Sequence, residues 1–311
     1  KAYAKKRDFT KAEEIAEKIS DEGWKSKAFA EIAKSYAEKG DFTKALTITK
    51  KISSETNKSW AFAEIAKSYA EKGDFTKALT ITKKISSETH KSYAFAEIAK
   101  AYAKKGDFTK AEEIAKKISN ETHKSYAFAE IAKAYAKKRD FTKALEIAEK
   151  ISDEGWKSRA FAHIAKSYAE KGDFTKALTI TKKISSETHK SWAFKRIAKS
   201  YAEKGDFTKA LTITKKISSE THKSYVFAYI AKAYAKKRDF TKALEITEKI
   251  SDNYWKSYVF AYIAKAYAKK GDFTKALTIA EKISNETNKS YAFEEIAKAY
   301  AKKEFKKSKR N

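Results

Sequence analysis

The chain contains no cysteine, no proline and no methionine among its 311 residues, and only eight glycines. Without cysteine it can form no disulfide, no thiolate metal site and no thiol nucleophile. The glycines occur singly, so the sequence has no glycine-rich loop that could hold a phosphate group. No stretch approaches 18 consecutive apolar residues, and the sequence therefore predicts no transmembrane helix.

Negative charge is also scarce, because 69 Lys and Arg residues face 41 Asp and Glu residues, a net charge of +28. The excess is spread along the chain, and only residues 302–311 form a charge run, with six basic residues and one acidic residue. Such a positive field favours acidic partners, such as nucleic acid, an anionic membrane, or an acidic glycan or peptide. A lysine-rich surface that only keeps the protein in solution has the same composition, and both interpretations stay open.

An Asp-Phe pair recurs every 33 residues, from Asp8-Phe9 to Asp272-Phe273, without insertion. A fixed period of this length is typical of solenoid arrays, in which each repeat contacts only its neighbours. We predict one continuous solenoid over residues 1–303, starting in mid-repeat, and a basic tail over residues 304–311. Because the chain lacks methionine and begins within a repeat, we also expect its N-terminus to be processed or trimmed.

Each repeat has the pattern of two helices. In the first helix, four apolar residues share one helical face: Phe62, Ile65, Ala66 and Tyr69. Gly73 is expected to end this helix, and Asp74 to cap the second one. A second apolar stripe occupies residues 75–85, and residues 86–89 (Ser-Ser-Glu-Thr) form a polar turn whose hydroxyls can cap the next helix.

The order Phe62-x-x-Ile65-Ala66-x-x-Tyr69-x-x-x-Gly73-Asp74-Phe75-x-x-Ala78 resembles the tetratricopeptide repeat, in a 33-residue variant. The match recurs in nine successive repeats. It departs from the family in three ways, since the family period is about 34 residues, a glycine usually follows Ile65, and a proline usually closes the repeat. Ankyrin repeats share the 33-residue period, but their Thr-Pro-Leu-His signature is absent. The resemblance implies an all-α fold, a right-handed α-solenoid of about nine helix–turn–helix repeats.

In the family, the first helices line a concave groove that binds extended peptides, and the resemblance places a stripe through Trp60, Ala63, Lys67 and Ala70 in that groove. Lysine occupies the centre of the stripe in every repeat: Lys34, Lys67, Lys100, Lys133, Lys166, Lys199, Lys232, Lys265 and Lys298. An aromatic ring precedes it in seven repeats: Trp60, Tyr93, Tyr126, Trp192, Tyr225, Tyr258 and Tyr291.

Two interpretations of this stripe remain open. It is either a groove for acidic, extended ligands, or a solvated lysine column beside rings that pack at the repeat junctions. Lys27 and Arg159 replace the ring where Trp24 and Trp156 supply one three residues earlier. One ring per junction favours the packing interpretation.

Four histidines recur at one turn position: His90, His123, His189 and His222. They lie whole repeats apart, at roughly 8–10 Å per helix step, whereas zinc ligands must lie about 2 Å from a shared ion. We therefore expect turn residues rather than a metal site, and no cofactor. His163 is predicted to be a surface residue. No serine or carboxylate pair stands beside a histidine base, so we expect no enzymatic activity.

Two sets of residues are candidates for glycosylation. Four asparagines fall in acceptor sequons, which we place in the exposed turn between repeats: Asn57, Asn120, Asn285 and Asn288. Chance is a competing explanation, because that turn is rich in Ser and Thr. A threonine column in the second helices is predicted to be exposed: Thr47, Thr80, Thr179 and Thr212. Thr49 and Thr82 are predicted to be packed.

These observations leave three hypotheses for function. The first is a non-enzymatic scaffold for other protein chains or for copies of itself, with a secreted or cell-surface fibre slightly favoured by the sequons and the uncapped leading edge. The second is an intracellular adaptor that binds acidic peptides through Lys67, Lys100 and Lys133. The third is non-specific binding of single-stranded nucleic acid. Sequence-specific readout is not expected, because the central lysine does not vary between repeats.

Overall fold

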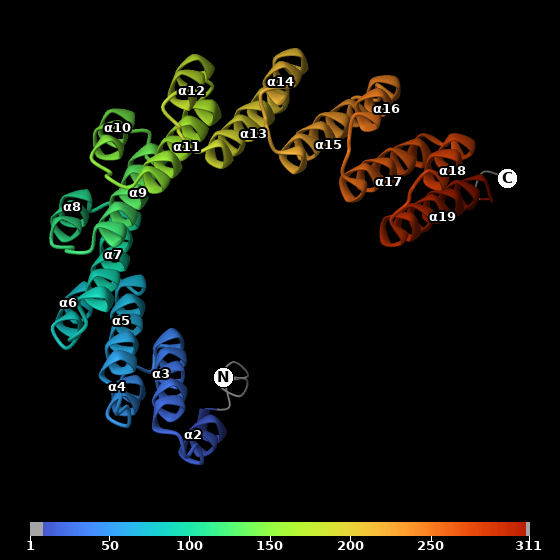
Figure 1. Cartoon of the computed structure of the whole chain (residues 1–311). Coiled ribbons are helices and arrows are strands. Elements are labelled where there is room, and N and C mark those ends of the chain that lie inside the picture. Colours follow the sequence, from blue (N-terminus) through green and yellow to red (C-terminus); the bar gives the residue numbers. More distant parts are fainter. Residues whose placement is uncertain (1–8, 309–311) are drawn as a thin grey trace. The chain divides into compact units, whose positions relative to one another are not determined.

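The computed structural model describes residues 9–308, which form 18 α-helices and no β-strand (Figure 1). Long helices alternate with short helices, and one of each makes a repeat. The long helices are α3 (Glu22–Lys39), α5 (Glu55–Glu71), α7 (Glu88–Lys105), α9 (Glu121–Lys137), α11 (Glu154–Lys171), α13 (Glu187–Glu203), α15 (Glu220–Lys236), α17 (Asn253–Lys270) and α19 (Glu286–Ser308). The short helices are α2 (Phe9–Glu17), α4 (Phe42–Thr49), α6 (Phe75–Thr82), α8 (Phe108–Lys116), α10 (Phe141–Glu149), α12 (Phe174–Thr181), α14 (Phe207–Thr214), α16 (Phe240–Glu248) and α18 (Phe273–Glu281). The predicted all-α solenoid is confirmed.

The helix boundaries lie where the capping residues predict them. The Asp74 carboxylate accepts a hydrogen bond from the backbone N–H of Lys77 at 3.1 Å and caps α6. Gly73 has a positive φ of 86°, and the N–H of Asp74 donates to the carbonyl of Tyr69, which closes the end of α5. Arg139 and Arg238 occupy the equivalent position with φ of 67° and 65°. Arg7, which also replaces this glycine, lies outside the described residues.

The core consists mainly of alanine and isoleucine, because the long helices approach each other closely. Ile65 and Ala66 are fully buried, and Tyr69 is 7% exposed. Tyr69 also stacks on Phe42 of the preceding repeat, with 3.6 Å between ring centroids. The same ring pair recurs at the other junctions within each half of the chain, as in Phe75–Tyr102. Thr49 and Thr82 are buried, which confirms the packed threonine position.

In seven long helices (α3, α5, α7, α9, α13, α15 and α17), a serine near the start ties the helix to the turn after its own short helix. Ser59 is 1% exposed, and its hydroxyl shares a hydrogen bond of 2.9 Å with the Ser86 hydroxyl. The same oxygen accepts the backbone N–H of Ser87 at 3.2 Å. Equivalent bonds join Ser92 to Ser119 and Asn120, and Ser257 to Ser284 and Asn285. The link holds each repeat closed on itself.

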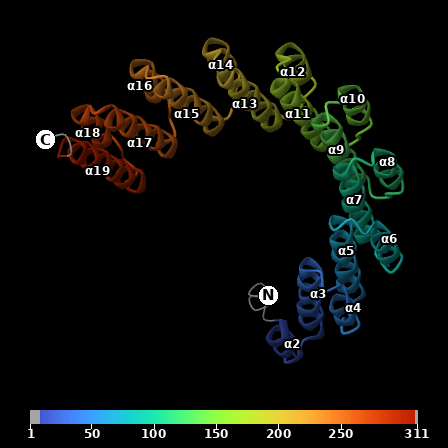
Figure 2. The ribbon, with the colours of Figure 1, turned by 180° about the vertical axis from the view of Figure 1, so that it is seen from behind.

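The chain divides into two compact halves, residues 1–160 and 161–311, with the boundary inside α11. In the N-terminal half, α3, α5, α7 and α9 pack side by side, and each contacts its own short helix (Figure 2). In the C-terminal half, α13, α15, α17 and α19 pack in the same way. The continuity of the array across that boundary stays a prediction.

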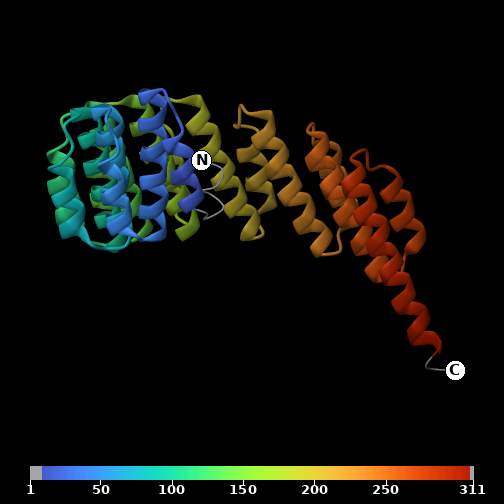
Figure 3. The same cartoon turned by 90° about the horizontal axis from the view of Figure 1, so that it is seen from below.

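The last helix, α19, is the longest and extends past its neighbours in the C-terminal half (Figure 3). It runs through Glu304 to Ser308, so the predicted tail begins inside this helix. Residues 309–311 and the predicted leading edge at residues 1–8 lie outside the described part. None of the described helices is long and apolar enough to cross a membrane.

Candidate functional site

The repeats differ from one another mainly on one face of the long helix. Positions are counted here from the first residue of each long helix, so that Glu55 is position 1 and Lys67 is position 13. Within the long helices, position 3 takes three residue types, while positions 6 and 10 take four each. Spacings of three and four residues place positions 3, 6, 10 and 13 on one helical face. We call positions 3, 6 and 10 together the variable face.

This face differs from the predicted groove stripe. Ala63 and Ala70, at positions 9 and 16, are 0% and 2% exposed and belong to the core. Trp60 and Lys67 are half-buried, and the side chain between them on this face of the helix is the buried Glu64 at position 10. The prediction that Ala63 lines a groove is wrong, because its small side chain lets neighbouring long helices pack directly on it. Ala70 is also largely buried, but it belongs to the lining of a hollow at the end of α5.

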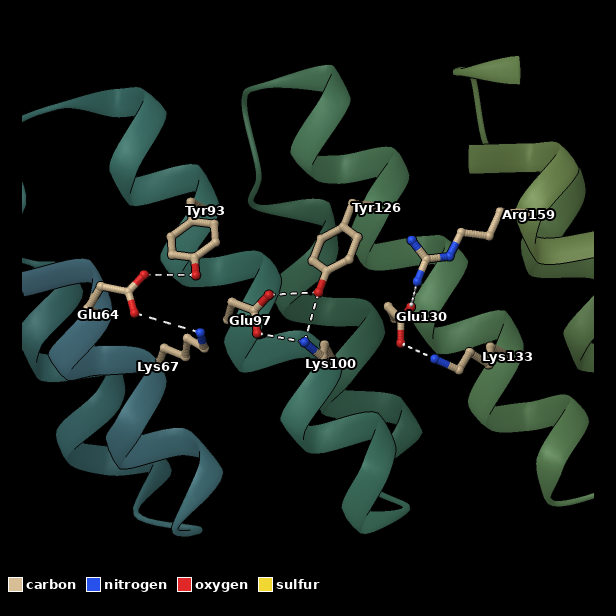
Figure 4. A network of polar contacts seen from close by, with 9 residues as sticks. All are labelled: Glu64, Lys67, Tyr93, Glu97, Lys100, Tyr126, Glu130, Lys133 and Arg159. Atoms are coloured by element: carbon tan, nitrogen blue, oxygen red, sulfur yellow. Dashed lines mark hydrogen bonds and ion pairs between the residues drawn. The ribbon is translucent and has the colours of Figure 1, made fainter. Parts of the chain in front are cut away.

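In α5, α7 and α9, position 10 is a buried glutamate held by the following repeat (Figure 4). Tyr93 donates its hydroxyl hydrogen to Glu64 at 3.0 Å, and the Lys67 ammonium lies 3.7 Å from the other carboxylate oxygen. Glu97 has the same partners one repeat later, with Tyr126 at 2.7 Å and Lys100 at 2.8 Å.

The third member of this ladder is Glu130, which pairs with Lys133 at 2.9 Å and with Arg159 at 3.3 Å. Arg159 occupies the position of Tyr93 and Tyr126, so a guanidinium takes over the role of the phenol hydroxyl. Each carboxylate therefore has a partner on its own helix and a partner on the next long helix, and Glu64 also lies 3.7 Å from Lys34 of the preceding long helix.

The ladder changes the electrostatics of the groups around it. Burial and the neighbouring carboxylates raise the pKa of Tyr93 and of Tyr126 well above the usual value of a phenol. Burial alone would lower the pKa of Lys67, but the Glu64 carboxylate 3.7 Å away raises it overall. Both effects keep the phenols and the ammonium protonated at neutral pH.

The nine predicted groove lysines already have partners. Eight of them lie within 4 Å of a carboxylate: Lys34 (Glu64), Lys67 (Glu64), Lys100 (Glu97), Lys133 (Glu130), Lys166 (Glu170), Lys199 (Glu203), Lys265 (Glu295) and Lys298 (Glu294). The exception is Lys232, which donates to the Tyr258 hydroxyl at 2.6 Å. The solvated-lysine interpretation and the charged-groove interpretation both overlooked these ion pairs.

The seven predicted rings lie at the repeat junctions, each beside a polar group of the preceding repeat. Lys34 lies 5.4 Å from the Trp60 ring centroid, and His163 lies edge-on to Trp192 at 4.9 Å. Tyr225, Tyr258 and Tyr291 have Lys195, Lys232 and Lys265 over their rings. This placement supports the packing interpretation for the rings. Trp24 differs, because it is 64% exposed.

The variable face is hollowed in the N-terminal half. A cavity of about 220 Å³ lies across α3, α5 and α7, and its lining includes Lys27, Asn57, Trp60 and His90. A second hollow of about 540 Å³ lies beside the ladder, and its lining includes Glu97 and Lys100 together with the end of α5. Side chains of the variable face and of position 13 thus contribute to both hollows.

In the C-terminal half the position-10 carboxylate is replaced. The residues there are His163, Arg196, Tyr229 and Tyr262, and glutamate returns only at Glu295. His163, which is predicted to be a surface residue, is half-buried because its ring packs against Trp192. The Arg196 guanidinium lies 5.0 Å from the Trp192 ring centroid.

The histidine column belongs to the first turn of the long helices and not to the turns between repeats. His90 is half-buried, and its Nδ1 lies 3.0 Å from the Ser87 hydroxyl. Burial lowers the pKa of His90, His123 and His222. Within residues 9–308, no group of three His, Asp or Glu side chains could hold a metal ion.

The sequon asparagines are less accessible than predicted. Asn120 and Asn285 are N-caps whose side chains accept backbone N–H groups at 3.0 Å. Asn57 and Asn288 lie at position 3 inside α5 and α19, and Nδ2 of Asn288 is buried. Asn120 and Asn285 lie in the turn, as predicted, and Asn57 and Asn288 do not; all four are half-buried, so the predicted exposure is too high.

The threonine column is exposed, as predicted. Each hydroxyl donates to the backbone carbonyl four residues earlier, at 2.9–3.0 Å, in Thr47, Thr80, Thr179 and Thr212. Whether any of these asparagines or threonines is modified stays a prediction.

Sequence reasoning missed the buried glutamates and the serine links. A glutamate three residues before every central lysine, in the first four repeats, was a signal for Glu31, Glu64, Glu97 and Glu130. A position-by-position comparison of the repeats also shows that the serine at position 5 of the long helix is constant, whereas positions 3, 6 and 10 vary.

No protein-family model matches the chain, and neither does any characterised protein sequence. Among solved structures, the chain is similar to Ton1535 from Thermococcus onnurineus NA1, at 18% identity and a TM-score of 0.34, over 95% of this chain and 97% of that one. It is also similar to a signal transduction ATPase with numerous domains and a tetratricopeptide repeat sensor from Pyrococcus horikoshii, at 19% identity and a TM-score of 0.39. That match covers 94% of this chain and 50% of the other.

Proposed function

We propose that the chain is a non-enzymatic repeat scaffold that binds a partner protein along the variable face of its long helices. The observation that carries the proposal is the distribution of differences between repeats. The residues at positions 5, 8, 11 and 12, most of which are buried, are the same in all nine long helices, while positions 6 and 10 take four residue types each. Packing needs the constant residues, and recognition of one partner accounts for the differences on the variable face.

The chemistry of the face supports a protein partner. Tryptophan, tyrosine and arginine, which dominate binding hot spots, occupy position 6 in eight of nine long helices. The hollow of about 220 Å³ beside Trp60 can receive a side chain of such a partner. Trp24 is 64% exposed on the same face and offers an apolar anchor. An extended segment that crosses α3, α5 and α7 meets all of these groups.

The experiment that tests the proposal is a selection from a random-peptide display library on the purified full chain, followed by affinity measurement for the selected peptides. Replacing Trp24, Trp60 and Tyr93 by alanine is expected to weaken these peptides at least tenfold. The matched control replaces Thr47, Thr80 and Thr179, which lie on exposed short helices, and is expected to leave affinity unchanged. Peptides that bind both variants as well as the parent chain would refute the proposal.

Binding of an acidic peptide through the central lysines would be opposed by the ion pairs that these lysines already form. Lys67, Lys100 and Lys133 are paired with buried glutamates, so an acidic ligand must compete with carboxylates already in place. We therefore expect affinity to come from the rings and hollows more than from these lysines. Alanine at the three lysines should change peptide affinity less than alanine at Trp24, Trp60 and Tyr93.

Self-association, a fibre, and a secreted or cell-surface location remain parts of the proposal without a structural argument. Self-association is tested by measuring the particle mass of the purified chain by light scattering over a series of concentrations. A particle that stays monomeric at high concentration would remove the assembly version and leave the binding version intact.

A further inference from the structure

The long helices of the C-terminal half combine cations and aromatic rings in a way that the N-terminal half does not. At position 10 the glutamates of the N-terminal half are replaced by Arg196, Tyr229 and Tyr262 in α13, α15 and α17. Helix α17 contains no acidic residue at all. The lysines at position 13 remain, so this surface keeps its positive charges and loses most of the carboxylates that would balance them.

Lys195 and Arg196 are the clearest departure from the repeat. The other long helices carry Ala at position 9 or, in α19, Glu294, whereas α13 has the cation Lys195 there, next to Arg196 at position 10 of the variable face. Both are half-buried, and the Nε atom of Arg196 is buried without a hydrogen-bond partner. Lys195 lies 5.3 Å from the Tyr225 ring centroid, and burial together with Arg196 lowers the pKa of Lys195.

Two adjacent, partly desolvated cations destabilise a protein unless an anion offsets them. No carboxylate lies within 4 Å of either cation in the described part of the C-terminal half. Glu203, at the end of α13, is already shared between Lys199 at 3.6 Å and the Tyr229 hydroxyl at 3.1 Å. The pair is therefore arranged for an anion that comes from another molecule.

The next two helices extend this surface with a repeated order of two rings and a lysine. Tyr225, Tyr229 and Lys232 follow one another on α15, and the same positions on α17 hold Tyr258, Tyr262 and Lys265. The Lys232 ammonium lies 4.6 Å and 4.8 Å from the ring centroids of Tyr258 and Tyr262. It is the one central lysine of the nine without a carboxylate partner, and it can move from the rings to an incoming anion.

We propose that the face formed by α13, α15 and α17 binds single-stranded nucleic acid, a function beyond the protein-binding scaffold. Lys195, Arg196 and Lys232 contact phosphates. The rings of Tyr229 and Tyr262 stack with bases once Lys199 and Lys232, which lie 5.2 Å and 4.8 Å from their centroids, move away from them. An acidic polypeptide would use the cations but leave the aromatic surface without a planar partner. Binding is not sequence-specific, since stacking and phosphate contacts accept every base.

The test uses the full chain and fluorescence anisotropy with labelled oligothymidylate and oligouridylate. The logarithm of the association constant for the oligonucleotides is expected to fall linearly with the logarithm of the salt concentration. The expected slope is about −0.7 per phosphate contact. The double substitution Lys195→Ala and Arg196→Glu restores the residues of the N-terminal repeats, so its folding is supported by four copies of that pair. It is expected to weaken binding at least tenfold and to make the salt slope shallower by about 1.

The matched control is Lys215→Ala with Lys216→Glu, which makes the same change in net charge on exposed residues that follow α14. It is expected to change affinity less than twofold. A second variant, Tyr229→Ala with Tyr262→Ala, separates stacking from charge and is expected to weaken binding about tenfold.

Three results would overturn the proposal. The first is the absence of oligonucleotide binding at low salt. The second is equal affinity for the Lys195/Arg196 variant and its control. The third is polyglutamate that binds more tightly than the oligonucleotides and is insensitive to the tyrosine substitutions, which would assign this face to an acidic polypeptide.

Discussion

At the scale of single residues, position 10 decides the charge of the long-helix face. A glutamate at this position neutralises the lysine three residues later and accepts a hydrogen bond from a tyrosine hydroxyl of the next long helix, as in Glu97 with Lys100 and Tyr126. A cation there, as in Arg196, adds to the lysine instead. One side chain per repeat therefore separates a neutralised surface from one that attracts anions.

The substitution Glu97→Ala tests how much the buried glutamate at position 10 contributes to stability. Removing the carboxylate leaves the half-buried Lys100 ammonium and the Tyr126 hydroxyl without their shared partner. We expect the free energy of unfolding to fall by about 1–3 kcal/mol, the range for a buried polar group that loses its partner. Urea unfolding followed by circular dichroism measures the change.

The control for this prediction is Glu38→Ala. Glu38 forms an ion pair with Lys34 at 3.9 Å, but its side chain is 60% exposed. An exposed pair contributes roughly 0–1 kcal/mol. Equal losses for Glu38→Ala and Glu97→Ala would show that burial of the ladder contributes nothing to stability.

At the scale of the helical elements, the turn between a long helix and its short helix requires a left-handed residue. Gly106 has a φ of 98°, and a Cβ added there would touch nothing within 4 Å. A side chain at this position is therefore disfavoured by the backbone conformation, and not by a clash with neighbouring atoms. Arg139 adopts the same region with a φ of 67° and bears the conformational cost of an L-residue.

Arg139→Gly is expected to stabilise the protein by about 1 kcal/mol, because glycine reaches this conformation without strain. Gly106→Ala is the reciprocal variant and should destabilise it by a similar amount. Differential scanning calorimetry of both variants beside the parent protein measures the two shifts. Shifts of the same sign would contradict this account of the turn.

Sequence alone predicted the features that depend on one helix or one turn. The stripe through Ile65 and Ala66, the cap at Asp74 and the glycine turn at Gly73 follow from local preferences, and the structure confirms them. The contacts of Ser59 with Ser86 and of Glu64 with Tyr93 join residues 27 and 29 positions apart. Their pairing depends on how helices pack, which spacing within one helix does not specify.

At the scale of the whole molecule, stability should follow the number of neighbouring repeats, because the helices of the two compact halves contact mainly their own and the adjacent repeat. Deletion of residues 88–120 removes one complete repeat and joins Ser87 to Glu121. Glu64 then meets Tyr126 in place of Tyr93, so the ladder keeps its partner. We expect the mean helicity per residue to be unchanged and the melting temperature to fall by a few degrees.

The control deletes residues 88–104 only, which removes most of α7 and leaves α8 without its long helix. This chain is expected to lose helicity and cooperativity, as seen by circular dichroism during thermal unfolding. A shortened protein that melts as cooperatively as the whole-repeat deletion would show that the repeat is not the unit of stability.

The pairing of position 10 with position 6 of the following repeat has a consequence for how such a chain can change. The repeat that carries Arg159 suits a predecessor with Glu130, and after a predecessor with Arg196 two guanidiniums would meet across the junction. Repeats with nearly the same sequence can therefore follow one another only in certain orders. Recombination between them is restricted to exchanges in which each new neighbour supplies the opposite half of the pair.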